Sequence, residues 1–176
     1  ILDSTPWDSS IDLSNHVAEV ELSELANGSS RVGISTKGIV ASVREDCGII
    51  MRCTQCRRVL KDGICAQHGS DSGNQDIRLR LVIDDGKATS SLLTNKDATL
   101  ELLGISEKDI VSEIDSNGQM EFVQSLRNKL LGKQVMASGR AIVDDQGTMI
   151  LADKTELIDI DPAMLATEIR AKWGMV

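Results

Sequence analysis

Apolar and polar residues alternate in several short segments of the chain, a pattern that predicts a mainly β protein. In the clearest case, residues 76–83, every second residue is apolar and two arginines lie on the opposite face. Residues 31–44 are rich in β-branched side chains and contain two glycines, which indicates a long, strongly bent strand. Further strands are expected at residues 49–53, 87–94, 133–143 and 148–160.

The middle of the chain follows helical spacing instead. A first segment at residues 95–114 is interrupted by Gly104, and a second at 119–131 ends at Gly132. Phe122 and its apolar neighbours lie on one side of the second segment, so we expect them in the core. About five strands, with helices before the last two, match a small Greek-key barrel.

The chain divides into a lead-in, a barrel and a last helix. Residues 1–16 are polar and predict a linker, and residues 17–160 contain the strands of the barrel. Asp161 as N-cap, followed by proline in the first turn, begins a helix at 161–176. The helix carries one narrow apolar stripe, formed by Leu165, Ile169 and Trp173. This stripe either packs on the barrel of its own chain or forms an interface with another subunit.

Three cysteines and one histidine have the spacing of a zinc site. The pattern Cys-x2-Cys-x8-Cys-x2-His is formed by Cys53, Cys56, Cys65 and His68. Each close pair can point two ligands inward, and Gly63 allows a tight turn between the pairs. A disulfide would require an oxidising compartment and would leave the histidine without a role, and a redox Cys-x-x-Cys pair is a further alternative. We expect one zinc ion in a ribbon at residues 53–68.

Four protein ligands complete a tetrahedral zinc site and leave no position for a reactive water, so the expected zinc is structural. Arg52, Arg57 and Arg58 lie beside the cysteines. They either offset the negative charge of the thiolates through contacts with the sulfur atoms, or lie on the ribbon surface and contact phosphates. Cys47 lies outside the pattern and is expected in the core.

The net charge of −8 argues against a nucleic-acid partner, but the distribution of charge along the chain does not. Between Arg31 and Arg80, nine basic and five acidic residues give +4, which leaves −12 for the remainder. Either a basic face lies on an acidic body, or the basic middle is chance scatter of surface charge. Aromatic residues make up only 2% of the chain, which excludes a binding platform of many stacked rings.

The sequence favours neither a membrane protein nor an enzyme. No apolar run approaches the roughly 20 residues that cross a bilayer and no signal peptide is recognisable, so we expect a cytoplasmic protein. The first residue is Ile1 rather than Met, as expected for a piece of a longer protein. With His68 assigned to zinc, no nucleophile and base pair remains and no phosphate-binding glycine loop is present, so we expect no catalytic activity.

The motifs also occur in a distinctive order. The zinc motif lies inside the predicted barrel and is followed by the arginine-bearing strand at 76–80 and an Asp-Asp-Gly turn at 84–86. The matching segments also include residues 31–40, 43–46, 57–60 and 63–69. Together they resemble the zinc-containing oligonucleotide-binding-fold (OB-fold) domain of archaeal replication protein A. The resemblance covers about residues 17–160.

This resemblance implies a fold and a function. The fold is mainly β with appended helices: a five-stranded Greek-key OB-fold barrel with an inserted zinc ribbon and a C-terminal helix. The function is binding of single-stranded DNA in replication, repair and recombination, in the cytoplasm at the nucleoid. In eukaryotic relatives a helix at this position assembles subunits, so the apolar stripe is a candidate contact with other replication protein A subunits or domains. The candidate DNA contacts are Lys37, Arg44, Arg52, Arg57, Arg58, Arg78 and Arg80.

The chain departs from the family in its lack of aromatic residues. Family members commonly stack bases on aromatic side chains, and the predicted barrel strands carry none. Binding would then depend on arginines, backbone amides and aliphatic contacts, and should be modest and strongly salt-dependent. The alternative is a protein-interaction module of a replication protein A complex with weak or no DNA binding of its own, which the net charge of −8 favours.

Overall fold

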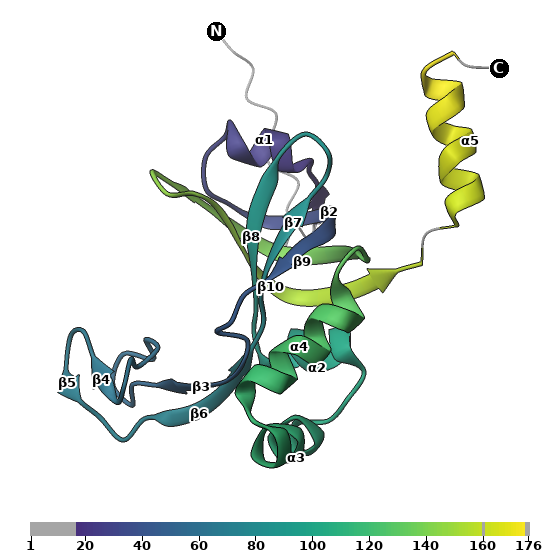
Figure 1. The fold of residues 1–176 in the computed structure, drawn as a ribbon. Coiled ribbons are helices and arrows are strands. Elements are labelled where there is room, and N and C mark those ends of the chain that lie inside the picture. The colour runs from purple at the N-terminus through teal and green to yellow at the C-terminus, as the bar shows by residue number, and fades with distance from the viewer. Residues whose placement is uncertain (1–16, 160, 175–176) are drawn as a thin grey trace, which may run out of the picture.

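A closed barrel of five strands forms the centre of the molecule (Figure 1). The computed structural model describes residues 17–159 and 161–174, without the side chains of Pro162, Leu165, Glu168 and Lys172. In spatial order the barrel strands are β2 (Arg31–Val43), β7 (Arg80–Asp84), β8 (Thr89–Thr94), β10 (Gly147–Ile158) and β9 (Gln134–Asp144). Because β9 also pairs with β2, the barrel closes on itself.

The order of the strands confirms the predicted Greek-key barrel. β8 and β10 run parallel, whereas the other neighbouring barrel strands are antiparallel. The chain therefore crosses from β8 to β9 through helices before β10 returns beside β8. A short strand, β1 (Ala18–Glu19), adds to β2 outside the barrel.

Helices cover both ends of the barrel (Figure 1). At one end lies α1 (Leu22–Ala26), and at the other lie α2 (Lys96–Leu103), α3 (Glu107–Asn117) and α4 (Gln119–Leu130). Gly104 ends α2 in the left-handed conformation with φ of 65°, as predicted from its position in the helical segment. Phe122 of α4 is buried in the core, which also confirms the sequence prediction. Apart from this ring and Cys47, the core of the described residues is aliphatic.

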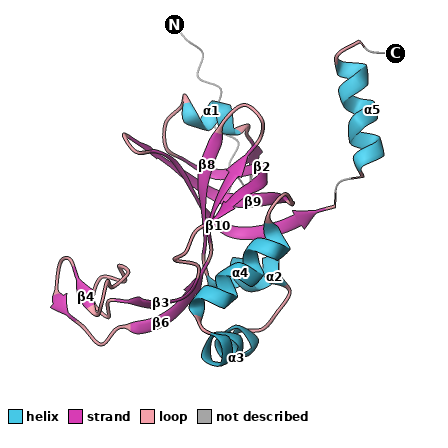
Figure 2. Cartoon of the chain, in the orientation of Figure 1, coloured by secondary structure: helices cyan, strands magenta, loops and turns pink. Residues whose placement is uncertain are grey.

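A two-stranded arm projects from the barrel (Figure 2). It consists of β3 (Gly48–Arg52) and β6 (Asn74–Arg78), with the small hairpin β4 (Ile64–Cys65) and β5 (Gly69–Ser70) at its tip. In the sequence, the arm, residues 48–78, is inserted between β2 and β7, the first and second strands of the barrel.

The segment predicted as one strand, residues 76–83, is divided at Leu79 between two sheets. Arg78 pairs with Gly48 in the arm, whereas Arg80 pairs with Leu93 in the barrel. Leu79 lies between the two sheets, where its N–H donates to Thr94 Oγ1 at 2.9 Å. The alternation itself is correct, because the four apolar side chains of the segment, Ile77, Leu79, Leu81 and Ile83, are fully buried.

The last helix, α5 (Pro162–Lys172), lies away from the barrel (Figure 1). Asp161 caps it as predicted, with its Oδ1 accepting a hydrogen bond from Ala163 N at 2.9 Å. The predicted linker at residues 1–16 lies outside the described part of the chain. Within the described ranges, no helix has the length and apolar character needed to span a bilayer.

Candidate functional site

The four predicted metal ligands, Cys53, Cys56, Cys65 and His68, converge near the tip of the arm. Their ligand atoms all lie within 4.8 Å of one another. Cys56 Sγ and Cys65 Sγ are 3.6 Å apart, and His68 Nδ1 lies 3.5 Å from Cys53 Sγ and 3.7 Å from Cys65 Sγ. Tetrahedral zinc with ordinary bond lengths requires S···S edges of about 3.8 Å and S···N edges of about 3.6 Å. The cluster is therefore compatible with zinc.

Local backbone turns bring the two ligand pairs together. Asp62 and Gly63 have φ of 52° and 75°, in a turn closed by mutual hydrogen bonds between Lys61 and Ile64. Beside this turn, Gln67 N donates to Cys65 Sγ at 3.4 Å. That bond, together with a bond from the backbone of His68, lowers the pKa of Cys65 to about 6 against the opposing effect of desolvation. The thiolate is the form of cysteine that binds a metal, so a lowered pKa suits Cys65 to this site.

The backbones of Arg57 and Arg58 bond to that of Cys53, at 3.0 and 2.8 Å, but the arginine side chains of the described arm do not bond to the ligand sulfur atoms. Arg52 pairs instead with Asp76 on the neighbouring strand, and its Nη1 donates to the carbonyl oxygen of Arg57 at 3.2 Å. Arg57 and Arg58 are exposed. Among the described residues, no arginine donates a hydrogen bond to the sulfur atoms of the ligands. Of the two interpretations open from the sequence, surface exposure fits Arg57 and Arg58 better than charge compensation.

Lys37 lies apart from the other predicted DNA contacts, in acidic surroundings. Its Nζ is 2.6 Å from Glu19 Oε1. The cavity that it lines, near α1, also contains the carboxylates of Glu21, Glu24, Asp84 and Asp85. A phosphate would be repelled from this cavity by the acidic excess. A contact between Lys37 and DNA stays a prediction from the sequence alone.

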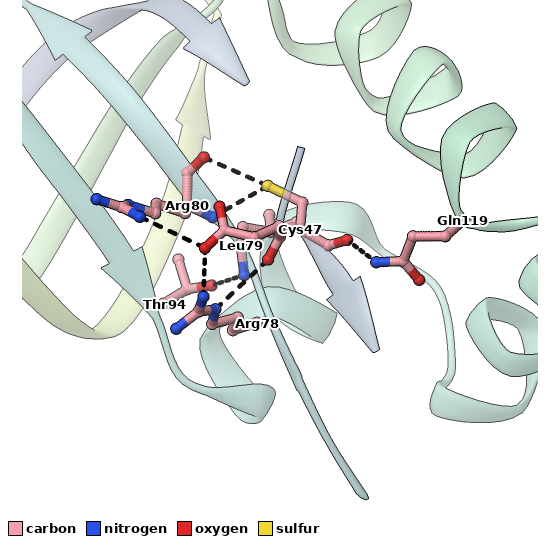
Figure 3. A network of polar contacts seen from close by, with 7 residues as sticks. Cys47, Arg78, Leu79, Arg80, Thr94 and Gln119 are labelled. Carbon is pink, nitrogen blue, oxygen red and sulfur yellow. Dashed lines mark hydrogen bonds and ion pairs between the residues drawn. The ribbon is translucent and has the colours of Figure 1, made fainter. Parts of the chain in front are cut away.

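Cys47 is hydrogen-bonded to Arg80 and Gln119 at the root of the arm, the place where the arm joins the barrel (Figure 3). Its thiol donates to the carbonyl oxygen of Arg80 at 3.3 Å and accepts from the N–H of Arg80 at 3.1 Å. The side-chain amide of Gln119 donates to the carbonyl oxygen of Cys47. Cys47 is fully buried, as predicted, and its desolvation raises the pKa of the thiol. It acts as a neutral group that ties the arm to the barrel.

Arg78 and Arg80 share one carboxylate at this root. Arg78 Nη2 pairs with Asp46 Oδ2, and Arg80 Nη1 lies 3.4 Å from the same oxygen. The side chain of Arg78 is only 11% exposed, whereas that of Arg80 is 35% exposed. Arg78 and Arg80, which the sequence favoured as phosphate contacts, thus both pair with the carboxylate of Asp46.

An apolar surface lies on the outside of the barrel beside this root. Four neighbouring strands contribute two rows of directly paired residues: Val82, Ser91, Met149 and Ile142 in one row, and Arg80, Leu93, Leu151 and Arg140 in the other. Directly paired residues point to the same side of a sheet, and the alternate residues Leu81, Leu92 and Ile150 are fully buried inside the barrel. We call these eight residues the outer face. It is an aliphatic surface with an arginine at each end of one row.

Sequence reasoning missed most of the outer face, since it identified only Arg80. The signal that could have found it is the run of consecutive apolar residues at 92–93 and 149–151. Such runs supply apolar groups to both sides of a strand, whereas a strand that faces water on one side alternates strictly. Arg140 lies within the predicted strand 133–143 but carried no motif.

The comparison with known proteins settles the fold. No family model matches the chain, and no curated protein matches its sequence. Among solved structures, a replication protein A heterotrimer bound to single-stranded DNA superposes with a TM-score of 0.56 at 13% sequence identity, covering 91% of this chain and 40% of that chain. The barrel is an OB-fold. This OB-fold chain thus spans less than half the length of its first structural neighbour.

Two further solved structures superpose with lower TM-scores. Yeast replication protein A bound to single-stranded DNA is 20% identical with a TM-score of 0.46, covering 80% of this chain and 84% of that chain. The Stn1–Ten1 complex of S. pombe is 12% identical with a TM-score of 0.40, covering 88% of each chain.

OB-folds bind oligonucleotides on the face of their second and third strands, between the loops that join strands one and two and strands four and five. Here β7 and β8 are the second and third strands, the arm replaces the first of these loops, and residues 144–147 form the second. The arm and the β9–β10 turn project on the same side of the barrel (Figure 1). The outer face therefore occupies the position at which OB-folds bind their ligands.

Proposed function

We propose that the chain is a non-catalytic domain that binds single-stranded DNA. The observation that carries this proposal is the outer face, an aliphatic surface flanked by Arg80 and Arg140 at the ligand position of an OB-fold. A structural neighbour bound to single-stranded DNA supports it. Replication, repair and recombination, at the nucleoid, are the processes in which we expect this binding to act.

Unpaired bases would contact the aliphatic part of the outer face. Leu93, Met149 and Leu151 are each partly exposed, so their side chains can contact the face of a base while the barrel stays folded. The aromatic ring of Phe122 is buried and takes no part. Because stacking on aromatic rings contributes about 1–3 kcal/mol per base elsewhere, its absence makes phosphate contacts the larger share of binding here.

Phosphates would lie along the arginines on either side of these bases. Arg80 and Arg140 border the outer face, and Arg57 and Arg58 are exposed on the arm. A bound strand that follows this line passes from the arm across β8 to β9. A duplex presents its phosphates but not its base faces, so the aliphatic surface favours single strands.

The arm would be held by one structural zinc ion. Zinc, when bound, supplies tetrahedral coordination by three thiolates and one imidazole and no reactive position. The cysteines and His68 fix the hairpin at the tip of the arm, which keeps Arg57 and Arg58 at a defined distance from the barrel. We propose no catalytic role for this site.

Replacing Arg140 with alanine tests the assignment of the outer face. We expect single-stranded DNA to bind about 3–10-fold more weakly whatever its sequence, and the slope of log K against log salt to fall by about 0.7. The matched control is Lys108→Ala, which removes one positive charge from an exposed position on α3. Equal binding by the two variants in a fluorescence titration would show that the outer face is not the interface.

We further propose that α5 binds a helix of another subunit. Two of the three residues of the predicted apolar stripe have exposed side chains, with exposed fractions of 41% for Ile169 and 70% for Trp173. The side chain of Leu165, the third predicted interface residue, lies outside the described part. A helix that leaves an apolar stripe uncovered buries it by packing against another helix. A neighbour that is a heterotrimer supports assembly as a role for this chain.

Charge placed on this stripe should reduce assembly. We expect the mass of the unmodified chain to rise with concentration in sedimentation or light scattering, and we expect Trp173→Glu to abolish this rise. Ala163→Glu is the control, because it adds the same charge at an exposed position of α5 that does not share the face of Ile169 and Trp173. An unmodified chain that stays monomeric at every concentration would contradict the proposed assembly through α5.

A further inference from the structure

A small cavity lies at the root of the arm, where three parts of the fold meet. Its volume is about 360 Å³, and its lining residues are Ser42, Val43, Arg44, Glu45, Asp46, Arg80 and Arg127. They come from the end of β2, the turn that follows it, the first residue of β7 and the last turn of α4. Three of them are arginines, and Arg127 was not singled out from the sequence.

The arginines of this cavity are incompletely satisfied. Arg44 and Arg127 form no ion pair with any residue in the described part of the chain. The Nε atom of Arg80 is buried and has no hydrogen-bond partner there. A buried N–H donor without an acceptor is costly, and the cost is removed when an oxyanion enters and accepts from it.

The carboxylate of Asp46 supplies part of the acceptors that the arginines at this cavity require. Its Oδ2 atom pairs with Arg78 and lies 3.4 Å from Arg80 Nη1, so one carboxylate oxygen serves two guanidinium groups. Its side chain is 41% exposed, so this carboxylate borders solvent as well as the two arginines. Carboxylates and phosphates are the two groups that arginine recognises through the same paired N–H geometry.

We propose that this cavity binds one phosphate group of a nucleic-acid strand, and that Asp46 is an internal competitor for it. Arg44, Arg80 and Arg127 surround the phosphate, which replaces the Asp46 carboxylate at Arg80 and supplies the acceptor that Arg80 Nε lacks. The proposal rests on the proposed function and names a specific phosphate site within it. Asp46 thereby lowers the affinity of the domain and makes release of the strand easier.

The test is Asp46→Asn, which keeps the size of the side chain and removes its charge. We expect single-stranded DNA to bind about 5–20-fold more tightly, and the salt slope to rise by about 0.7 as one more phosphate is neutralised. Glu101→Gln is the matched control, because Glu101 is exposed on α2, lies outside the lining of this cavity and carries the same charge. It forms no ion pair with a described residue, and we expect less than about a twofold change and an unaltered slope.

Two further variants separate this site from a general effect of charge. Arg127→Ala should weaken binding, and Asp46→Asn should give no gain in a chain that already carries Arg80→Ala. Thermal melting checks that each variant is folded, and Arg127→Ala alone still tests the cavity if Asp46→Asn is unstable. Equal gains for Asp46→Asn and Glu101→Gln, while the unmodified chain binds, would overturn the phosphate site and leave the proposed function intact. Absence of binding by every variant would overturn both.

Discussion

Replacing Cys65 with serine is expected to abolish metal binding and to unfold the tip of the arm. The described arm has almost no core of its own: Cys53, Leu60 and Cys65 are its buried cluster, with Cys56 packed against them. Three of these four residues are ligands, so the folding of the tip and metal binding are one event. Zinc supplies about 10–16 kcal/mol in small domains of this kind, and no other local interaction can replace it.

The measurement is metal content together with limited proteolysis. The unmodified chain should carry one zinc ion, and the variant less than about 0.1, with rapid cleavage in residues 53–70. Cys47→Ser is the control, since Cys47 is a buried cysteine outside the cluster. The barrel has a separate core and should remain folded in both variants. Full zinc content after Cys65→Ser, or an equal loss after Cys47→Ser, would contradict the assignment of the ligands.

Replacing Gly139 with alanine should destabilise the barrel by about 3 kcal/mol or more. Gly139 lies where β9 pairs with both neighbours, opposite Ile34 on one side and Ala152 on the other, and both ladders shift register beside it. A Cβ atom there would overlap the carbonyl oxygen of Leu151 and lie 3.1 Å from Ala152 Cα. Because these are backbone atoms inside a closed barrel, no rotation of a side chain can relieve the clash.

Thermal unfolding measures this effect. For a domain of this size, a loss of 3 kcal/mol lowers Tm by about 6–12 °C. Ser138→Ala, one residue away on the same strand, removes only a hydrogen bond to Ser35 Oγ at 3.2 Å and should cost about 1 kcal/mol or less. A Gly139→Ala barrel as stable as the unmodified one would mean that the closure of β9 between β2 and β10 is described incorrectly.

The metal cluster could be predicted because its information is local. Cys53 and Cys56 lie within one turn of backbone, Cys65 and His68 within another, and Gly63 supplies the turn between the pairs. The alternation of residues 77–83 likewise reports burial directly, since period two is a property of one strand. Neither inference needs knowledge of which strands become neighbours.

The roles of the arginines could not be predicted, because they depend on contacts between distant segments. Arg78 meets Asp46, which is 32 residues earlier in the chain, only because the arm folds back on itself. Arg140 and Leu93 belong to one surface only because β10 lies between their strands. Sequence periodicity gives the face of each strand but not the order of the strands, and the outer face arises from that order.

Lys37 illustrates the same limit. It is one basic residue within a basic stretch of sequence, but the fold places it beside Glu19 in an acidic cavity. Net charge counted along a sequence segment therefore does not describe the surface that the segment forms.

The most direct test of the central claim is a titration of a labelled thymidine oligonucleotide with the zinc-loaded protein, followed by fluorescence anisotropy at low and moderate salt with unlabelled duplex as competitor. A domain that binds single strands through the outer face and its arginines predicts salt-sensitive binding that duplex fails to displace. Absence of binding even at low salt, or displacement by duplex as effective as by single strands, would contradict it.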